Sequence, residues 1–139
     1  MASPQSSEAR RFYRCAFQRF EEAGVLFRAE LTTGAVYLAG YGVECILKAM
    51  LLQTAPPGRQ KDILDSFRGR SAHDFGWLRE NYLLNGGARF PMETTKNFML
   101  VSDWSTDLRY SPVRIGNADA ETFLNAARHI LSWADGRIR

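Results

Sequence analysis

Cysteine and histidine are scarce in this sequence, which contains two of each among 139 residues. Cys15 and Cys45 lie in apolar surroundings and lack the CxxC spacing of a redox or zinc motif. A four-ligand zinc site would need all four residues, at spacings that do not suit it. These counts exclude a disulfide-stapled fold, and we expect neither a metal nor another cofactor. Both cysteines are interpreted as small buried hydrophobic residues.

Long apolar runs and a signal-like start are also missing. No uninterrupted apolar run approaches the roughly 18 residues of a membrane-spanning helix, and residues 1–14 are polar. The composition, 45% hydrophobic and 24% charged, is that of a folded chain and rules out global disorder. We expect one domain over residues 1–139, located in the cytoplasm and not associated with a membrane.

Neither sign of charge dominates, because 18 Lys and Arg face 15 Asp and Glu for a net charge of +3. This mild balance does not by itself indicate nucleic-acid binding. Fifteen of the 18 cations are Arg, a side chain suited to planar, bidentate recognition of phosphate and carboxylate.

Recognisable catalytic motifs are absent as well. The sequence has no phosphate-binding glycine loop of the P-loop or Rossmann kind, no HExxH and no GxSxG. Catalysis by a Cys–His pair would need Cys15 or Cys45 close to His73 or His129, whereas both cysteines are predicted to lie buried in helices.

Strand-like alternation is missing, and apolar residues instead recur every three or four positions. This pattern predicts an all-α fold, an up-down bundle of four to five main helices plus a short ancillary helix. Ser7, Thr33 and Asn117 are the expected N-caps, and Gly136 is expected to close the last helix. The predicted helices cover residues 7–30, 33–53, 60–67, 73–86, 91–108 and 117–136.

The second predicted helix is apolar on nearly every side, so it should be the central one. Its only charges are Glu44 and Lys48, four residues apart and near Tyr41. Charges in such a helix need a partner, so the two either form an ion pair at the rim or with another helix, or face a cleft. Gly40 and Gly42 predict close backbone approach of a neighbouring helix.

Two further polar elements are candidate site residues. His73 and Asp74 stand at a predicted helix start, where Asp74 can act as the N-terminal charge and His73 as a structural neighbour that bonds the backbone or Asp74. Arg109 and Tyr110 open a loop, and a guanidinium beside a ring can hold a phosphate and stack a base. Alternatively, Arg109 ties this loop to Glu44 or another acid. We expect Arg109 and Tyr110 to lie within reach of Glu44 or Lys48.

Taken in order, these features resemble the HEPN superfamily. The resemblance covers residues 9–135 and is carried by Tyr13 and Ala16 in the first helix, AVYLAGYGVECILKAML at 35–51, His73-Asp74-Phe75, Arg109-Tyr110-Ser111-Pro112 and the closing helix at 118–133. It implies a bundle of four main helices with a short additional one, and frequent homodimers. Relatives are often encoded beside minimal nucleotidyltransferases, as toxin–antitoxin or related partners.

Some members of this superfamily are metal-independent endoribonucleases, whereas others are non-catalytic nucleotide-binding or interaction modules. The catalytic members carry Arg, four to six residues, then His, near the start of the last long helix. Here Arg114 and His129 are too far apart, and Arg68 and His73 have the spacing but lie ahead of the third helix. We therefore expect no catalytic residues.

The leading hypothesis is a non-catalytic HEPN-like module that binds a nucleotide, a nucleic acid or a protein, with a nucleotidyltransferase as the candidate protein partner. The alternatives are an endoribonuclease toxin, in which a His acts as general acid or base and an Arg stabilises charge, and a purely structural homodimer. The candidate ligand-binding residues are Arg109, Tyr110, Glu44, Lys48, Tyr41 and His73.

Overall fold

The structure is a computed structural model, and it describes residues 6–138. Within that range there are helices and no strands, which confirms the all-α prediction. The α-helices are α1 (Ser7–Arg28), α2 (Thr32–Thr54), α3 (Gln60–Ser66), α4 (Phe75–Leu84), α5 (Met92–Val101) and α6 (Asn117–Ile138). Short 3-10 helices are η1 (Pro57–Arg59), η2 (Arg70–His73) and η3 (Thr106–Tyr110).

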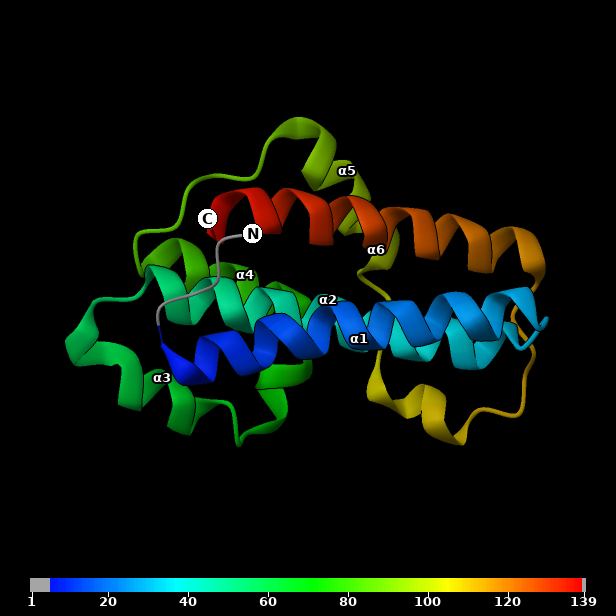
Figure 1. The fold of residues 1–139 in the computed structure, drawn as a ribbon, viewed down its shortest axis with the longest axis horizontal. Helices are drawn as coiled ribbons and strands as arrows, with labels where there is room; N and C mark the ends of the chain where they lie inside the picture. Colours follow the sequence, from blue (N-terminus) through cyan, green and yellow to red (C-terminus); the bar gives the residue numbers. More distant parts are fainter. Residues whose placement is uncertain (1–5, 139) are drawn as a thin grey trace.

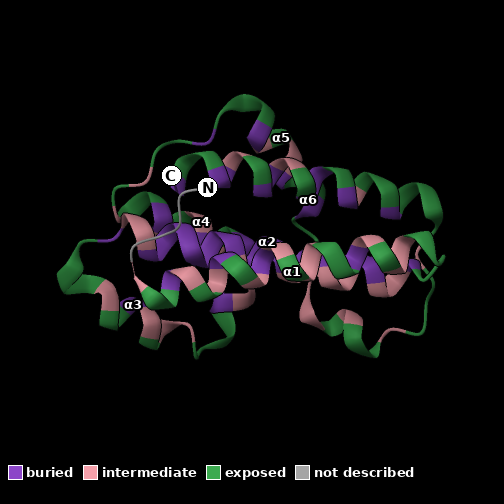
Figure 2. Ribbon diagram, in the orientation of Figure 1, coloured by how far each residue is buried: buried purple, intermediate pink, exposed green. Residues whose placement is uncertain are grey.

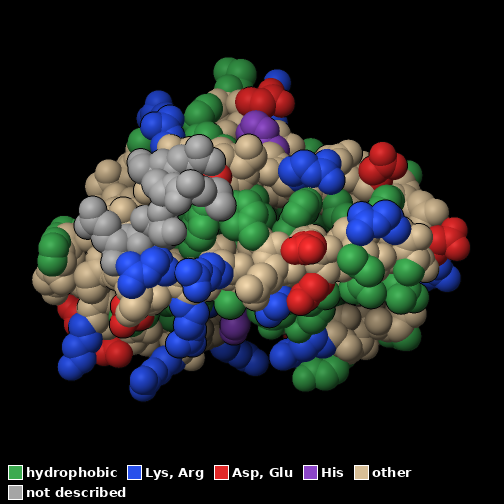
Figure 3. Space-filling model, viewed as in Figure 1, with side chains coloured by type: hydrophobic (Ala, Val, Ile, Leu, Met, Phe, Trp, Pro, Cys, Tyr) green, Lys and Arg blue, Asp and Glu red, His purple; other side chains and the backbone are tan. Residues whose placement is uncertain are grey.

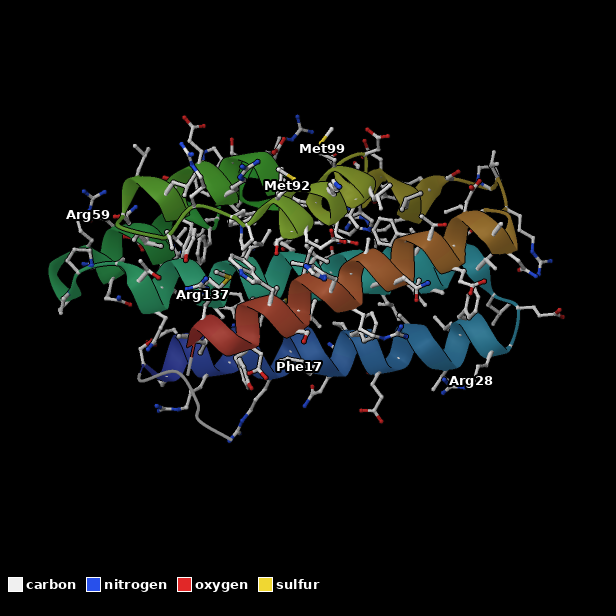
Figure 4. The ribbon with its side chains drawn as sticks, turned by 90° about the horizontal axis from the view of Figure 1, so that it is seen from above. Phe17, Arg28, Arg59, Met92, Met99 and Arg137 are labelled. Carbon is white, nitrogen blue, oxygen red and sulfur yellow. The ribbon has the colours of Figure 1, made fainter. Side chains whose placement is uncertain are left out.

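Three long helices form the body of the bundle. Helices α1 and α2 make an antiparallel hairpin, and α6 runs alongside them (Figures 1 and 4). Helix α2 packs against α1, α4 and α6, while α5 packs on α6. Helix α3 and the segments η2 and η3 lie on the side of the α1–α2 layer that faces away from α5 and α6 (Figure 1).

Helix α2 is the core of the bundle, as its composition predicted. Fifteen of its 23 residues are buried, and Figure 2 shows the concentration of buried residues along it. By length and composition alone α2 could also cross a membrane, a possibility that counting uninterrupted apolar runs missed. However, 78% of its 18-residue apolar window is buried inside the bundle, as in the core helix of a globular domain.

Three predicted helix ends differ from those in the structure. The N-cap of α1 is Ser6, whose hydroxyl accepts from the Ala9 amide, one residue before the predicted cap Ser7. Helix α6 continues through Gly136 to Ile138, because the tail still packs on the bundle at Ile138. The fifth predicted helix ends early, at Val101, and its remainder turns into the separate segment η3.

Thr33 is not the cap of α2 either, because its hydroxyl is hydrogen-bonded to the loop before α6. Thr33 Oγ1 donates to the Val113 carbonyl at 3.2 Å and accepts from the Ile115 amide at 3.0 Å. The neighbouring Thr32 hydroxyl donates to the Ile115 carbonyl. These bonds pin the loop before α6 to the start of α2.

The two glycines of α2 allow two different kinds of close approach. A Cβ on Gly42 would lie 3.0 Å from the Ala16 carbonyl oxygen, so this position confirms the predicted helix–helix contact. At Gly40 the neighbouring group is a side chain, because a Cβ there would lie 1.9 Å from Nε1 of Trp104. Gly40 thus makes room for an indole from the loop after α5, not for a neighbouring helix.

Candidate functional site

The charges of α2 form a buried ion pair at the centre of the molecule. Lys48 Nζ donates to Glu44 Oε2 at 2.9 Å, and the two residues are only 5% and 3% exposed. A buried pair is tolerated when further contacts compensate the loss of water around each charge. Here Glu44 and Lys48 make those contacts with different neighbours: Glu44 with His73, and Lys48 with the rings of Phe12 and Phe67.

His73 supplies the second contact of Glu44. Its Nδ1 lies 2.9 Å from Glu44 Oε1, although the two residues are 29 positions apart. His73 thus packs beside α2, and the partner of its Nδ1 is Glu44 rather than the predicted backbone group or Asp74. Asp74 is instead the N-cap of α4 and accepts from the Trp77 amide at 3.0 Å. The predicted role of Asp74 at the helix start is confirmed.

This contact orients the His73 imidazole. An ionised carboxylate can only accept, so Nδ1 of the ring carries the donated hydrogen. In the neutral ring Nε2 then remains as an acceptor, and it has no protein hydrogen-bond partner among residues 6–138. Because the side chain is 43% exposed, Nε2 is available to a ligand.

His73 forms part of the wall of a polar hollow between η2 and η3, which lie on the same side of the molecule (Figure 1). This His73 hollow has a volume of about 460 Å³. It brings together two guanidinium groups and an imidazole with two carboxylates and two hydroxyls. Its lining residues are Arg70, His73, Asp74, Trp104, Ser105, Thr106, Asp107 and Arg109.

Arg109 enters the hollow from η3. Its Nε donates to the Thr106 carbonyl at 3.1 Å, and its guanidinium lies 5.1 Å from the Tyr110 ring centroid. It makes no ion pair with Glu44, so it does not tie the loop to that acid. Instead, Arg109 lies in the same hollow as His73, and His73 is the residue that links the hollow to Glu44. Tyr110 is 77% exposed and lies outside the lining.

An aromatic cluster forms the back of the hollow. The Trp104 ring stacks on Phe75 at 5.2 Å, and Tyr41 meets it edge-on at 5.3 Å. Burial, followed by a hydrogen bond with Tyr37, raises the pKa of Tyr41 to about 12. Tyr41 is thus a neutral phenol that supports Trp104 from behind.

The family of this helical bundle follows from a comparison of its sequence with protein-family models. The chain matches the HEPN domain over residues 9–137, nearly its whole length. It belongs to the HEPN family. Comparisons with curated proteins and with solved structures returned no match. The match to the HEPN domain confirms the resemblance seen in the sequence.

Lys48 faces away from the His73 hollow. Its ammonium lies 5.6 Å from the Phe12 ring centroid and 5.1 Å from that of Phe67. These two rings belong to a second depression of the HEPN domain, which we call the α1/α3 groove. It is lined by Glu8, Arg11, Phe12, Lys61, Leu64, Asp65, Phe67 and Arg68. Arg68 and His73 thus line different depressions, although their spacing resembles that of the ribonuclease motif.

Arg70 and Trp104 line the hollow but were not among the candidate site residues predicted from the sequence. Arg70 lies in η2, three residues before His73, where no helical periodicity places it on a face. Trp104 falls inside the predicted helix 91–108, whereas in the structure it lies in the loop after α5. The pairing of Trp104 with Gly40 was the available signal, because a glycine in a buried helix can accept a large ring.

The cysteines of the HEPN domain are free and half-buried, so they are less buried than the sequence predicted. Burial and the neighbouring Glu44 carboxylate raise the pKa of Cys45 to about 12, which keeps the thiol protonated at neutral pH. In residues 6–138 no group of three His, Cys, Asp or Glu side chains is arranged to hold a metal ion.

Proposed function

We propose that this HEPN domain is a non-catalytic module that binds the phosphate of a nucleotide in the His73 hollow. The observation that carries this proposal is the convergence of Arg70, His73 and Arg109 on one hollow from two separate segments. Guanidinium groups form bidentate, charge-assisted hydrogen bonds with phosphate oxygens. The imidazole, held by Glu44, supplies an acceptor at Nε2 for a hydroxyl of the ligand, such as a ribose hydroxyl beside the phosphate.

The neighbouring groups fit the remainder of a nucleotide. Asp74 and Asp107 in the lining can accept hydrogen bonds from ribose hydroxyls, which neither Arg side chain can do. The exposed Tyr110 ring, beside Arg109, offers a stacking surface for a base at the edge of the hollow. Lys48 and Tyr41 contribute indirectly, by holding Glu44 and Trp104 in place.

Calorimetric titration with ATP, GTP and their diphosphates tests this proposal. Arg109→Ala should weaken binding by about 1.5–3 kcal/mol, the range for hydrogen bonds to charged groups. Arg128→Ala is the matched control, since it removes the same charge from an exposed position on α6 outside the hollow. Equal affinity of Arg109→Ala and the unaltered protein would refute the ligand role of Arg109.

Metal-independent RNA cleavage is a second candidate function, favoured by the carboxylate–imidazole contact in a hollow that also holds two Arg residues. His73 would take a proton from a ribose 2′-hydroxyl, and Arg70 or Arg109 would stabilise the charge that develops on phosphate. RNA cleavage in excess EDTA that is lost in a folded His73→Ala variant would favour this function. Cleavage at background level, with nucleotide binding intact, would favour the non-catalytic module.

We further propose that the protein acts in the cytoplasm as a homodimer, in a toxin–antitoxin-like system with a minimal nucleotidyltransferase as partner. Exposed apolar side chains of α5, namely Met92, Met99 and Leu100, provide a surface that a second subunit could cover. Figure 4 shows Met92 and Met99 on the outer side of this helix. The chain also contains 17 aromatic residues, a type that is enriched in interface cores. Sedimentation that shows only monomer at micromolar concentration would contradict the dimer.

A further inference from the structure

The α1/α3 groove combines exposed cations with aromatic rings. Phe12 and Phe67 meet edge-on at 5.6 Å, and both remain partly exposed in the groove. Lys48 lies beneath them and holds them as a platform from the buried side. Rings of this kind are a stacking surface for a base, because every base has a π-face.

An arginine strip runs along α1 beside this platform. Arg10, Arg11 and Arg14 line a second, shallow depression together with Ser7, Cys15 and Gln18, and none of these described lining residues is acidic. Arg11 lines both depressions, so the strip and the groove are continuous. Figure 3 shows Lys and Arg side chains gathered over the first half of α1 and over α3.

The groove and the strip differ in the charges of their lining residues. The groove contains the carboxylates of Glu8 and Asp65 as well as its cations, so it attracts a phosphate less strongly than the strip does. The strip has positive charge only, so a phosphate is stable there. A ligand that fits both has an anionic backbone next to a flat, polar ring whose amino groups can donate to carboxylates.

We propose that the arginine strip and the α1/α3 groove form a binding surface for single-stranded nucleic acid. Its phosphates lie along Arg11 and Arg14, and an unpaired base stacks on the Phe67 ring in the groove, with the perpendicular Phe12 ring beside it. A duplex does not fit this arrangement, because its bases are already stacked on one another. The surface is separate from the His73 hollow, so this proposal does not depend on the nucleotide-binding proposal.

The test is fluorescence anisotropy of the full chain with a labelled, unstructured ten-nucleotide RNA of mixed sequence, from 50 to 300 mM salt. Each phosphate neutralised on a single strand adds about −0.7 to the slope of log K against log salt. Contacts to two phosphates predict a slope near −1.4, and Arg11→Ala should bring it about halfway to zero. Phe67→Leu, which keeps an apolar side chain but removes the ring, should weaken binding by about five- to hundredfold, the stacking range.

Two controls separate this surface from others. Arg128→Ala removes an equal charge from α6 and should leave RNA affinity unchanged, and Arg109→Ala should lower nucleotide affinity alone. Thermal melting of each variant by circular dichroism checks that it is folded, and Arg14→Ala replaces any variant that is not. The proposal is overturned if no RNA binds at 50 mM salt or if Phe67→Leu binds normally. It is also overturned if polyglutamate or phosphatidylserine vesicles bind as tightly as the RNA, because the surface would then select only for negative charge.

Discussion

The His73 hollow and the α1/α3 groove lie on different sides of one buried ion pair, and they use its two ends differently. The Glu44 oxygen that does not bond Lys48, Oε1, contacts His73, which lines the hollow. Lys48 directs its ammonium to the rings of Phe12 and Phe67, which line the groove. One charge therefore orients a polar group, and the other supports an aromatic platform.

The walls of the two depressions differ in the same way. The hollow is made by η2, the turn before α4, the loop after α5 and η3, which are segments without a regular helical face. Apart from Trp104, its lining side chains are polar. The groove is made mainly by the helices α1 and α3, whose spacing presents apolar residues and cations in rows. The comparison suggests that a change to the ion pair affects both depressions, whereas a change to either wall affects one.

Removal of one charge of the pair should have the largest effect. Lys48→Met leaves the Glu44 carboxylate buried with only His73 beside it, and we expect the free energy of unfolding to fall by about 3–5 kcal/mol. Urea denaturation measures this change. Lys96→Met is the control, because Lys96 is exposed on α5 and its loss should cost little.

The double variant Glu44→Met with Lys48→Met sharpens the comparison. With both charges replaced by apolar side chains of similar length, much of the lost stability should return. The groove would keep an apolar floor, while His73 would lose its partner, so nucleotide affinity should stay low when stability recovers. A single Lys48→Met variant as stable as Lys96→Met would contradict the burial argument.

A change behind the hollow should have the next largest effect. In Gly40→Ala the new Cβ would meet the Trp104 indole at 1.9 Å, and such overpacking costs about 1–3 kcal/mol. The displaced Trp104 should also deform the hollow and leave the groove intact. Urea denaturation and the tryptophan emission spectrum measure both effects.

Gly136→Ala provides the matched comparison for that variant. A Cβ on Gly136 would meet nothing within 4 Å, and alanine in a helix interior is favoured over glycine by about 1 kcal/mol. Gly136→Ala should therefore be neutral or slightly stabilising. If Gly40→Ala were equally stable, Trp104 would not occupy the position described.

The smallest effect should appear at alkaline pH. Tyr41 and Cys45 have pKa values raised to about 12 from ordinary values of 10.0 and 9.0, so the unfolded chain loses these protons first. Their contribution to stability is complete below pH 9 and is lost as pH rises toward 12, because the unfolded state then binds fewer protons than the folded state.

Two single variants separate the contributions of Cys45 and Tyr41 to this decline. Cys45 lies near Cys15 and Arg19 of α1, whereas Tyr41 lies against Trp104 behind the hollow. Urea midpoints between pH 8 and pH 10.5 should fall less steeply in Cys45→Ala, and in Tyr41→Phe above pH 10. An unchanged slope in both variants would contradict the raised pKa values.

The helical pattern was sufficient to predict much of the fold. The 3.6-residue periodicity placed all six α-helices, and the uniform apolarity of 35–52 identified α2 as the core. Helix ends were predicted less well where a tertiary contact competes with the local signal. Thr33 has the residue type of a cap, yet its hydroxyl bonds the loop at 113–115 instead.

The candidate site was predictable as a set of residues but not as an arrangement. Glu44, His73 and Arg109 stood out as polar groups in apolar or loop surroundings, and the structure connects them through His73. Arg70 carries no comparable signal in the sequence, because a 3-10 turn gives it no periodic position. Tyr110, next to Arg109 in sequence, lies outside the lining of the hollow and is 77% exposed.

The sequence by itself determined that this chain is a helical bundle of the HEPN family, since periodicity and local motifs depend on neighbours within a few residues. Only the tertiary structure decided which charges share a depression. His73 meets Glu44 across 29 positions, and Lys48 turns toward Phe12 and Phe67. Such contacts depend on how α2 is rotated between its neighbours, and that rotation is set by packing of the whole core rather than by any local segment.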